Sequence, residues 1–356
     1  MEEVIVEDGL ALVDKVGPGQ YTLVVIEALK QLGYNVIVPK KDFLAKIKNK
    51  NIRRVMYLIW LNTLFFLKLL LLKKNTPIIY TNYSVPFIKV YKVKTLPVIH
   101  DLCSYLFPQT MTKIQNFYSI IATNNAIKNA DKIITVSKTV KEEIEEQFKV
   151  SSGDIYVVYN SNTLNMKSFK ENIIEDTFKK FDIQRQQYIV AVSTFNRRKN
   201  IMELIEAFNM LSKENVELKM VLVGRSGNDE TINAIQAKNK NIVFTGYLSN
   251  QELDVIYKNA LVFISPSLYE GFGIPIIDAQ KYGVPVICSD IPVYREIAGQ
   301  SAEKCLPQRN GFYESLKKIL ASSEYRNELI NNGYKNIAKY SIDIVKSQLE
   351  VLLKNA

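Results

Sequence analysis

The chain has 356 residues, of which 47% are hydrophobic and 23% charged, proportions that are typical of globular proteins and exclude a disordered chain. This length predicts about two domains, each with enough residues to bury a core. The three scattered cysteines, Cys103, Cys288 and Cys305, exclude a disulfide framework and favour a reducing compartment.

The net charge of +10 is concentrated in one stretch. Between Lys40 and Lys94 there are thirteen Lys or Arg residues and one acid, Asp42. Such a stretch attracts nucleic acid or an anionic membrane. Zinc-finger spacing, an aromatic ribonucleoprotein motif and a recognition-helix pattern are all missing, so we expect an anionic membrane surface and no nucleic acid. Residues 1–14 carry five acids and no leading basic segment, so we expect no secretory signal and a cytoplasmic protein.

The first half of the chain alternates between strand and helix patterns. Residues 4–6 predict a short strand, a flexible turn with Gly17 and Gly19 follows, and a periodic helix covers 23–32 before the next strand over 35–38. Parallel sheets bind ligands at this first crossover. Gly17 and Gly19 are therefore candidate ligand-binding residues, and a simple tight turn is the alternative.

Residues 55–72 are the most apolar stretch of the chain. Eighteen residues could just span a bilayer, but Asn62, Thr63 and Lys68 interrupt the stretch. Basic residues flank it on both sides and give no inside–outside asymmetry. We expect a helix of the first domain with a partly exposed apolar face, compatible with lying on a membrane, and we rank a transmembrane helix second.

His100 is the one histidine of the chain. It stands beside Asp101 where residues 97–102 predict the end of a strand, and ligands collect at that end of a parallel sheet. A single histidine is more often a structural hydrogen-bonding residue than a catalyst, and both interpretations stay open on the residues alone. Further on, a helix is predicted over 112–129, and Ser137 ends a strand and caps the next helix.

The composition changes over residues 166–187, which are polar and weakly periodic. This change predicts an interdomain linker that contains at most a short helix, after a first domain over 1–165. Strand and helix patterns then alternate again, which predicts a second parallel α/β domain over 188–340. An amphipathic helix is predicted over 341–353.

The strongest site signal follows a predicted strand over 260–264. Glu270 precedes a turn with two glycines around an aromatic residue, and the helix after this turn carries Asp278. Glycines let the backbone approach a ligand, and amides at a helix start attract an anion. Two carboxylates beside an anion cradle predict a site for a phosphorylated sugar. Its candidate donor-binding residues are Gly271, Phe272, Gly273, Ile274 and Asp278.

Arg198 and Lys199 lie in a basic turn after the first strand of the second domain. Cations there can neutralise a diphosphate, arginine as a fork and lysine as a point charge. A solvated basic turn is the alternative, but this turn and the Glu270 turn should share one edge of the sheet, which favours binding. Gly224 and Arg225 end the next strand and are expected either to line a nucleotide pocket or to form a simple turn.

The sequence has no Asp-x-Asp motif at a strand end, no metal-spaced His/Cys cluster and no Walker loop. We therefore expect no metal and no cofactor, because the lysine, the arginine and the helix start can supply the positive charge that a metal would.

Together these residues resemble the group 1 family of retaining glycosyltransferases (glycosyltransferase family 4) over nearly the whole chain. The most specific element is a pair of acids separated by seven residues; here the first acid is Glu270, and the second is Asp278 where the family has glutamate. The other matching segments are Gly17–Gly19, Val98–Leu102, Ala130–Ser137, Arg198–Asn200 and Ser265–Gly273.

The resemblance implies a GT-B fold, in which two Rossmann-like α/β domains face each other across a cleft. It implies that the final helix, 341–356, crosses back onto the first domain and that the Gly17–Gly19 loop lies at the cleft. It also implies that His100 contacts the transferred sugar from the domain opposite the donor.

For the second domain, the resemblance implies that Arg198 and Lys199 bind the donor diphosphate. Glu270 would contact the donor hexose and Asp278 the ribose hydroxyls. The amides of Phe272 and Gly273 would contact phosphate or sugar.

These implications lead to one expected function: transfer of a hexosyl group, with retained anomeric configuration, from a nucleotide diphosphate sugar to an acceptor hydroxyl. The expected acceptor is a saccharide or lipid-linked saccharide of capsule, O-antigen or exopolysaccharide assembly, reached at the inner face of the cytoplasmic membrane. A mannosyltransferase is one specific form, and GDP-mannose and UDP- or dTDP-hexoses all stay open as donors. One alternative is a non-catalytic GT-B-like partner subunit. A second is a nucleotide-sugar 2-epimerase, but that reaction needs further acid–base groups, and the sequence has one histidine. The chain is too short for a pyridoxal-dependent phosphorylase.

Overall fold

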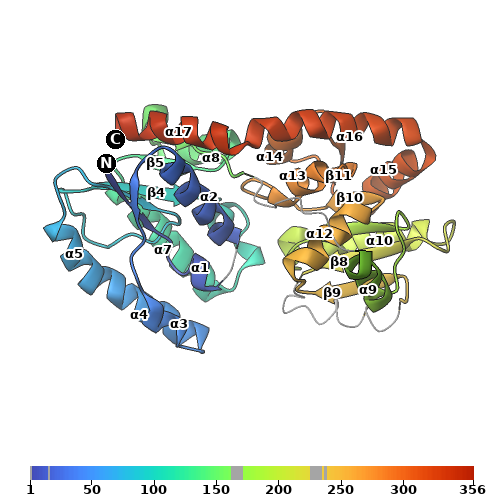
Figure 1. Cartoon of the computed structure of the whole chain (residues 1–356), viewed down its shortest axis with the longest axis horizontal. Coiled ribbons are helices and arrows are strands. Elements are labelled where there is room, and N and C mark those ends of the chain that lie inside the picture. The colour runs from blue at the N-terminus through green and yellow to red at the C-terminus, as the bar shows by residue number, and fades with distance from the viewer. Residues whose placement is uncertain (1, 15–16, 162–170, 225–234, 236–238) are drawn as a thin grey trace. The chain divides into compact units, whose positions relative to one another are not determined.

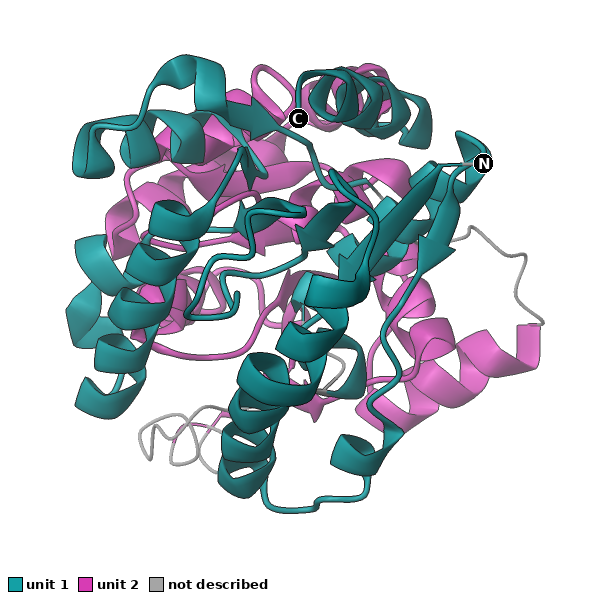
Figure 2. Ribbon diagram, turned by 90° about the vertical axis from the view of Figure 1, so that its left-hand side faces the viewer, with its two compact units in different colours: residues 1–163, 340–356 teal, residues 164–339 magenta. Residues whose placement is uncertain are grey.

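The computed structural model describes residues 2–14, 17–161, 171–224, 235 and 239–356. The chain forms two compact units, which Figure 2 colours separately. The first unit comprises Met1–Thr163 and Tyr340–Ala356, and the second comprises Leu164–Lys339. Each unit is built on a six-stranded parallel sheet with helices packed on it.

The sheet of the first unit has the strand order β2-β1-β3-β4-β5-β6. Its strands are rich in valine and isoleucine because helices cover both faces of a parallel sheet. The order reverses between β1 and β3, and ligands bind at the carboxyl ends of strands beside such a reversal. The strands are β1 (Glu3–Glu7), β2 (Asn35–Ile37), β3 (Pro77–Tyr80), β4 (Lys94–Ile99), β5 (Ile133–Thr135) and β6 (Ile155–Val157).

The helices of the first unit include one long segment made of α4, η1 and α5 in direct succession, which packs into the core with its buried side. The last helix, α17, packs against α2, so the end of the chain belongs to this unit. The described helices are α1 (Ala11–Asp14), α2 (Gly17–Gln31), α3 (Asp42–Ala45), α4 (Lys50–Trp60), η1 (Leu61–Phe65), α5 (Phe66–Leu71), α6 (Cys103–Leu106), η2 (Pro108–Thr110), α7 (Lys113–Asn129), α8 (Lys138–Phe148), η3 (Ser152–Asp154) and α17 (Ile342–Asn355).

The flexible turn expected at Gly17–Gly19 is instead the start of helix α2. Proline in the first turn of a helix costs no hydrogen bond and fixes a helical backbone angle, so Pro18 is compatible with this start. Gly19 allows α2 to pass close to α1, since a Cβ there would lie 2.7 Å from the carbonyl oxygen of Ala11. The prediction of a loop here was wrong.

The sheet of the second unit has the order β12-β11-β10-β7-β8-β9, which reverses between β7 and β10. Its strands are β7 (Tyr188–Val192), β8 (Lys219–Val223), β9 (Ile242–Gly246), β10 (Val262–Ser265), β11 (Val286–Ser289) and β12 (Glu303–Cys305). Its described helices are α9 (Glu171–Phe181), η4 (Arg197–Lys199), α10 (Ile201–Leu211), α12 (Asn250–Asn259), α13 (Ile274–Lys281), α14 (Pro292–Ala298), α15 (Arg309–Ala321) and α16 (Ser323–Ile337), and η5 (Ala338–Tyr340) joins it to the first unit. Two parallel α/β units are the architecture that the alternating patterns predicted.

Most of residues 166–187, which we expect to form an interdomain linker, is instead packed into the second unit. Helix α9 packs against α12 with Ile174 and Thr177 buried, and Lys180 forms an ion pair of 2.6 Å with Glu252. Residues 171–187 are therefore part of the second unit. The segment is polar overall, but α9 has one narrow apolar stripe, and this stripe is enough for it to pack against α12. The remaining residues of the expected linker, 166–170, lie outside the described residues.

Candidate functional site

The carboxyl ends of β7 and β10 bring two predicted site segments together. The strands pair in parallel, with Val262 opposite Ile189 and Phe263 opposite Val190. The basic turn η4 follows β7, and the turn with Glu270 follows β10. Because the strand order reverses between these two strands, both turns lie at the point where doubly wound sheets bind ligands.

Glu270 is held between the two predicted cations. Its carboxylate accepts a hydrogen bond of 2.9 Å from Nη1 of Arg198 and forms an ion pair with Nζ of Lys199. Ser267 Oγ donates a third bond of 2.8 Å to the same carboxylate. Burial alone would raise the pKa of Glu270, but Lys199 and Arg198 outweigh it and lower the pKa to about 2. The carboxylate is therefore ionised at every physiological pH.

Further hydrogen bonds fix Arg198 relative to the Glu270 turn. The carbonyl oxygen of Arg198 accepts from the backbone amide of Leu268 at 2.8 Å, and Nη1 also donates to the carbonyl oxygen of Tyr269 at 2.7 Å. Asn196 caps η4 by accepting from the amide of Lys199 at 3.2 Å. The guanidinium is thus positioned before any ligand arrives, which is the preorganisation that electrostatic catalysis requires.

The start of α13 needs the glycine that precedes it. Gly273 has φ +106°, a backbone conformation that side-chain-bearing residues rarely adopt, and a Cβ there would lie 2.8 Å from the Tyr294 ring. Tyr294 is held in turn by a hydrogen bond of 2.6 Å with Ser265 Oγ. Pro275 in the first turn starts the helix. The positive end of the helix dipole therefore lies directly after the Glu270 turn.

Asp278 is placed on α13 with its carboxylate almost completely buried, at 7% exposure. Its Oδ1 has no hydrogen-bond partner among the described residues. Burial raises the pKa of Asp278 to about 7, with Lys281 lowering it and Asp254 raising it further. A buried acceptor without a donor is costly unless a ligand supplies the donor. A ligand hydroxyl group is one such donor.

Asp254 is the acid that flanks Asp278 from helix α12. It accepts a hydrogen bond of 2.6 Å from the hydroxyl of Tyr282. The pKa of Tyr282 is raised, first by burial and then by this bond, so Tyr282 stays a donor. No local signal in the sequence marks Asp254 or Ser267, except that Ser267 stands in the same turn as Glu270.

His100 lies in the first unit, directly after β4. Its Nε2 is 2.8 Å from the carbonyl oxygen of Thr81; since a carbonyl only accepts, Nε2 carries the proton. The ring meets Tyr21 edge-on at 5.1 Å between centroids. Burial lowers the pKa of His100, opposed by the Thr81 hydrogen bond and by Asp101. The imidazole is therefore neutral near pH 7, with an unprotonated Nδ1.

The predicted glycine positions differ in whether the backbone and its neighbours require a residue without a side chain. Gly17 is the first residue of α2 and its Cβ position is open, so the fold does not itself require glycine there. Gly224 has φ +133°, and a Cβ there would lie 1.9 Å from the carbonyl oxygen of Ser193, so close packing of the β7 and β8 ends requires it. Arg225 lies outside the described residues. Gly271 and Phe272 are buried in the turn before α13, and Ile274 is its first residue.

The described part of the chain contains no cluster of side chains that could bind a metal ion. Among residues 2–14, 17–161, 171–224, 235 and 239–356, no group of three or more His, Cys, Asp or Glu side chains is placed to hold an ion. The charges at the β7–β10 edge are instead two cations on one carboxylate, an arrangement suited to an anionic ligand that carries hydroxyl groups.

Two family profiles match the chain in succession. "Glycosyltransferase Family 4" matches residues 17–161, and "Glycosyl transferases group 1" matches residues 173–336. The first match lies within the first unit and the second within the second unit.

Curated relatives and solved structures are similar over long stretches. The O-antigen chain mannosyltransferase RfbU of Salmonella typhimurium is 26% identical over 324 residues, which cover 90% of this chain and 85% of that protein. O-antigen chain mannosyltransferase B of Escherichia coli is 25% identical over 213 residues, which cover 58% of this chain and 56% of that protein. The structure of Anabaena HepE in complex with UDP and glucose matches with a TM-score of 0.71 at 14% identity and covers 100% of both chains.

Proposed function

We propose that this chain, which belongs to the group 1 family of glycosyltransferases (glycosyltransferase family 4) and has the GT-B fold, is a retaining hexosyltransferase. It moves a hexosyl group from a nucleotide diphosphate sugar to an acceptor hydroxyl. The observation that carries the proposal is the ionised Glu270 held between Arg198 and Lys199 at the strand-order reversal of the second sheet.

The cation pair acts on the donor diphosphate. Arg198 and Lys199 together exceed the charge of Glu270 by one, so the site attracts an anion, and a diphosphate adds oxygens that both cations can bind. Negative charge develops on the leaving phosphate as the glycosidic bond breaks. Preorganised cations stabilise that charge more than they stabilise the intact donor, which lowers the barrier. In this proposal the cations and the start of α13 replace a metal, so the reaction is insensitive to a chelator.

The two acids bind hydroxyl groups rather than cations. Glu270 remains charged and accepts from hydroxyls of the transferred hexose. Asp278 accepts from ribose hydroxyls through the buried Oδ1 that has no partner among the described residues. Aspartate is shorter than the family's glutamate by one methylene, so we propose that the ribose lies closer to α13. His100 contributes a neutral imidazole to the sugar, the role implied by the family resemblance.

The proposed acceptor is a saccharide or lipid-linked saccharide of O-antigen, capsule or exopolysaccharide assembly. Support comes from the names of the relatives, two of which are O-antigen chain mannosyltransferases. A mannosyl donor is therefore the first to test, and a UDP-sugar is the second because the structure of the HepE neighbour holds UDP and glucose.

The experiment is a donor screen followed by turnover. Purified protein is melted with GDP-mannose, UDP-glucose, UDP-N-acetylglucosamine and a dTDP-hexose, with free GDP, UDP and dTDP as controls. A ligand at about a hundredfold its dissociation constant stabilises the fold by about 2.7 kcal/mol, which is measurable as a rise in melting temperature. The stabilising donor is then assayed for hydrolysis and for transfer with and without EDTA.

Two results would contradict the proposal. If none of the donors stabilises the protein, the diphosphate assignment is wrong. If a donor binds but is neither hydrolysed nor transferred to membrane extracts that contain lipid-linked saccharides, the non-catalytic partner subunit becomes the better interpretation. Lys199→Ala is the matched variant: loss of the Glu270 ion pair should lower its ligand-free melting temperature, and addition of the donor should then give no further rise.

A further inference from the structure

One described helix, Lys50–Leu71, is long and apolar enough to cross a membrane by length and composition. Its two sides differ. The buried side joins the core of the first unit through Tyr57, Trp60, Leu61, Phe65 and Leu69. The opposite side exposes large apolar side chains along its whole length: Ile52, Val55, Ile59, Leu64, Leu67 and Leu71, with Met56 and Leu70 beside them.

One π-helical turn keeps the buried side and the exposed side of the helix Lys50–Leu71 each in line with the helix axis. The segment η1 (Leu61–Phe65) is π-helical, so it takes up more residues per turn than the α-helix on either side. The buried series Tyr57, Leu61, Phe65 and Leu69 repeats every fourth residue, which would drift around a regular α-helix of 3.6 residues per turn. The wider turn corrects this drift. The exposed series makes its one long step, from Ile59 to Leu64, across the same turn.

The buried side determines how such a helix can meet a bilayer. A helix that crossed the bilayer would withdraw its five core side chains from the first unit. A helix that lies along the surface keeps these contacts and buries only the exposed stripe. The structure therefore favours an interfacial orientation.

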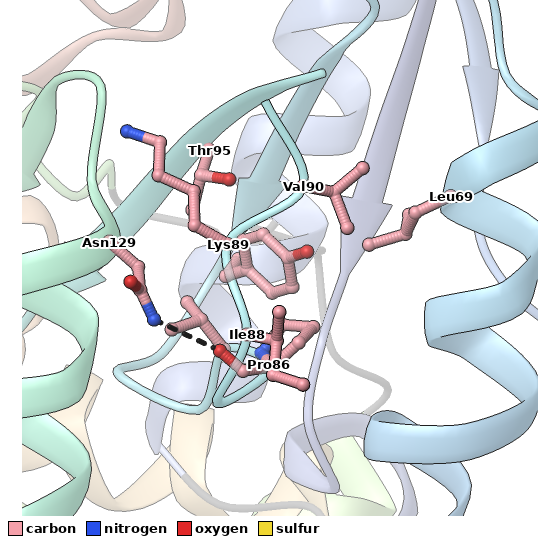
Figure 3. A pocket seen from close by; sticks show the side chains of 9 residues that line it. Leu69, Pro86, Ile88, Lys89, Val90, Thr95 and Asn129 are labelled. Carbon is pink, nitrogen blue, oxygen red and sulfur yellow. Dashed lines mark hydrogen bonds between the residues drawn. The ribbon is translucent and has the colours of Figure 1, made fainter. Parts of the chain in front are cut away.

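Two neighbouring segments extend the exposed stripe into a wider surface. The segment 85–91 is tied to the long helix by the Phe87 amide, which donates to Oδ1 of Asn62 at 2.8 Å. It is tied to helix α7 by Nδ2 of Asn129, which donates to the carbonyl oxygen of Pro86 at 3.2 Å, as Figure 3 shows. Nδ2 of Asn125 donates to the carbonyl of Val85 at 3.1 Å.

The segment and α7 also expose large apolar side chains. In the segment these are Phe87, Ile88 and Tyr91, the last at 86% exposure. On α7 they are Ile114, Phe117 and Ile121, with Ile114 at 82% exposure. We call the exposed side of Lys50–Leu71, residues 87–91 and the exposed side of α7 the apolar face; Figure 1 labels the helices α4, α5 and α7 that carry it. A set of large exposed side chains on three joined elements is more than the scattered apolar residues of an ordinary surface.

Cations lie on the long helix and on both of its flanks, and we call them the positive rim of the apolar face. The exposed basic residues on the long helix and its two flanks, with the connection to β4, are Lys46, Lys48, Lys50, Arg54, Lys68, Lys73, Lys74 and Lys92. Over the whole range from Lys40 to Lys94 there is one acid, Asp42. An apolar surface with a positive rim complements the acyl boundary and the anionic headgroups of a phospholipid bilayer. The charge argues against a second copy of the chain as the occupant, since two such rims would repel each other.

The apolar face is rigidly joined to the edge of the sheet that carries His100. Tyr57 donates from its hydroxyl to the buried carboxylate of Glu7 at 2.9 Å, directly at the end of β1. The backbone carbonyl of Glu7 accepts from the amide of Thr81 at 2.8 Å, and Thr81 accepts in turn from His100. Lys41 forms ion pairs with Glu7 and Asp8, which anchors the chain just before α3.

We propose that the apolar face is a docking surface for an anionic phospholipid bilayer, on which the helix Lys50–Leu71 lies without crossing it. Docking would bring the sheet edge with His100 to a lipid-linked acceptor, and only this purpose depends on the proposed function. The docking itself is independent of which donor is used.

The test is cosedimentation with vesicles of phosphatidylcholine alone and of phosphatidylcholine with phosphatidylglycerol, at low and high salt. The wild-type chain should bind the anionic vesicles, with at least tenfold weaker binding to the neutral ones and at high salt. Leu67→Asp, Ile88→Asp and Phe117→Asp, one on each element, should each weaken binding at least tenfold. Val216→Asp is the matched control, because Val216 is also an exposed apolar residue but lies in the second unit.

Every outcome of this test either supports or overturns the docking proposal. These side chains are exposed, so melting temperatures and the donor-induced stabilisation should match the wild type, which separates a failure of docking from a failure of the proposed function. Wild-type protein that stays in the supernatant with anionic vesicles at low salt overturns the proposal, and so do three variants that bind as the control does. A lipid-free dimer that Leu67→Asp dissociates would also overturn it, because the face would then be an interface between copies of this chain.

Discussion

Asp278 offers a direct physical test of the donor site, because its ionisation should be visible in the stability of the protein. The perturbation is Asp278→Asn, which keeps the shape and removes the titration. Burial raises the pKa of this carboxyl from 3.8 to about 7 in the folded chain, while the unfolded chain has the ordinary value. An acid whose pKa is raised by folding holds its proton more tightly when folded. Its contribution to stability is therefore complete below about pH 3.8 and is lost as the pH rises through about 7.

The magnitude follows from the same two values. Proton linkage at about 1.4 kcal/mol per pH unit gives a total loss of about 4 kcal/mol for the Asp278 carboxyl between low pH and pH 8. Of this, about 2–3 kcal/mol falls between pH 5 and pH 8. Asparagine does not titrate, so the variant should become more stable relative to the wild type by that amount over the interval.

The assay is urea unfolding of both proteins at pH 5 and pH 8. The control is Glu252→Gln, since Lys180 and Ser249 lower the pKa of Glu252 to about 2. A lowered pKa gives stability that is present above pH 4.5 and lost only as the pH falls below it, so this control should keep a constant difference between pH 5 and pH 8. Equal Asp278→Asn differences at both pH values would refute the buried, raised-pKa assignment.

The remaining predictions concern the other site residues. Lys199→Ala should lower kcat/KM about a hundredfold to a thousandfold, by about 3–4 kcal/mol of transition-state stabilisation, and a near-normal rate would remove the diphosphate role. Gly273→Ala should destabilise the second unit by about 1–3 kcal/mol because of its backbone angle and the Tyr294 contact, whereas Gly17→Ala, where space is open, should not; thermal unfolding compares them. His100→Ala should reduce transfer more than donor binding in the melting assay, and an equal loss of both would assign His100 to structure. Donor affinity of the wild type, measured by titration, should rise from pH 6 to pH 8 as Asp278 ionises and becomes the better acceptor, and should stay flat in Asp278→Asn.

Much of the fold could be predicted because its signals are local. The strand predicted over 4–6 lies within β1 (Glu3–Glu7), and Ser137 caps α8 by accepting from the amide of Val140 at 3.2 Å. The helix predicted over 112–129 forms as α7 (Lys113–Asn129). Caps, turns and periodic burial depend on residues a few positions apart, so the sequence by itself carries them.

Other elements depended on distant partners and were missed. The segment at Gly17 is helical because α2 packs tightly against α1. Helix α9 exists as part of the second unit because α12 provides a surface for it. The polar edge strand β12 (Glu303–Cys305) has no apolar run of its own and forms by pairing with β11. In each case a contact outside the segment outweighs a weak local preference.

For the candidate site, the sequence determined the chemistry: two cations, two acids and a glycine turn in the second domain, and a histidine in the first. Only the tertiary structure decided how they combine. Glu270 meets Lys199 and Arg198 across sequence separations of 71 and 72 residues, and these pairings, not the residue type, lower the pKa of the Glu270 carboxyl. Asp278 differs because its helix buries it beside a second acid and leaves one oxygen without a partner among the described residues. Two carboxylates in one motif thus receive opposite pKa shifts, because the charges and the solvent around each are set by strands and helices far away in the chain.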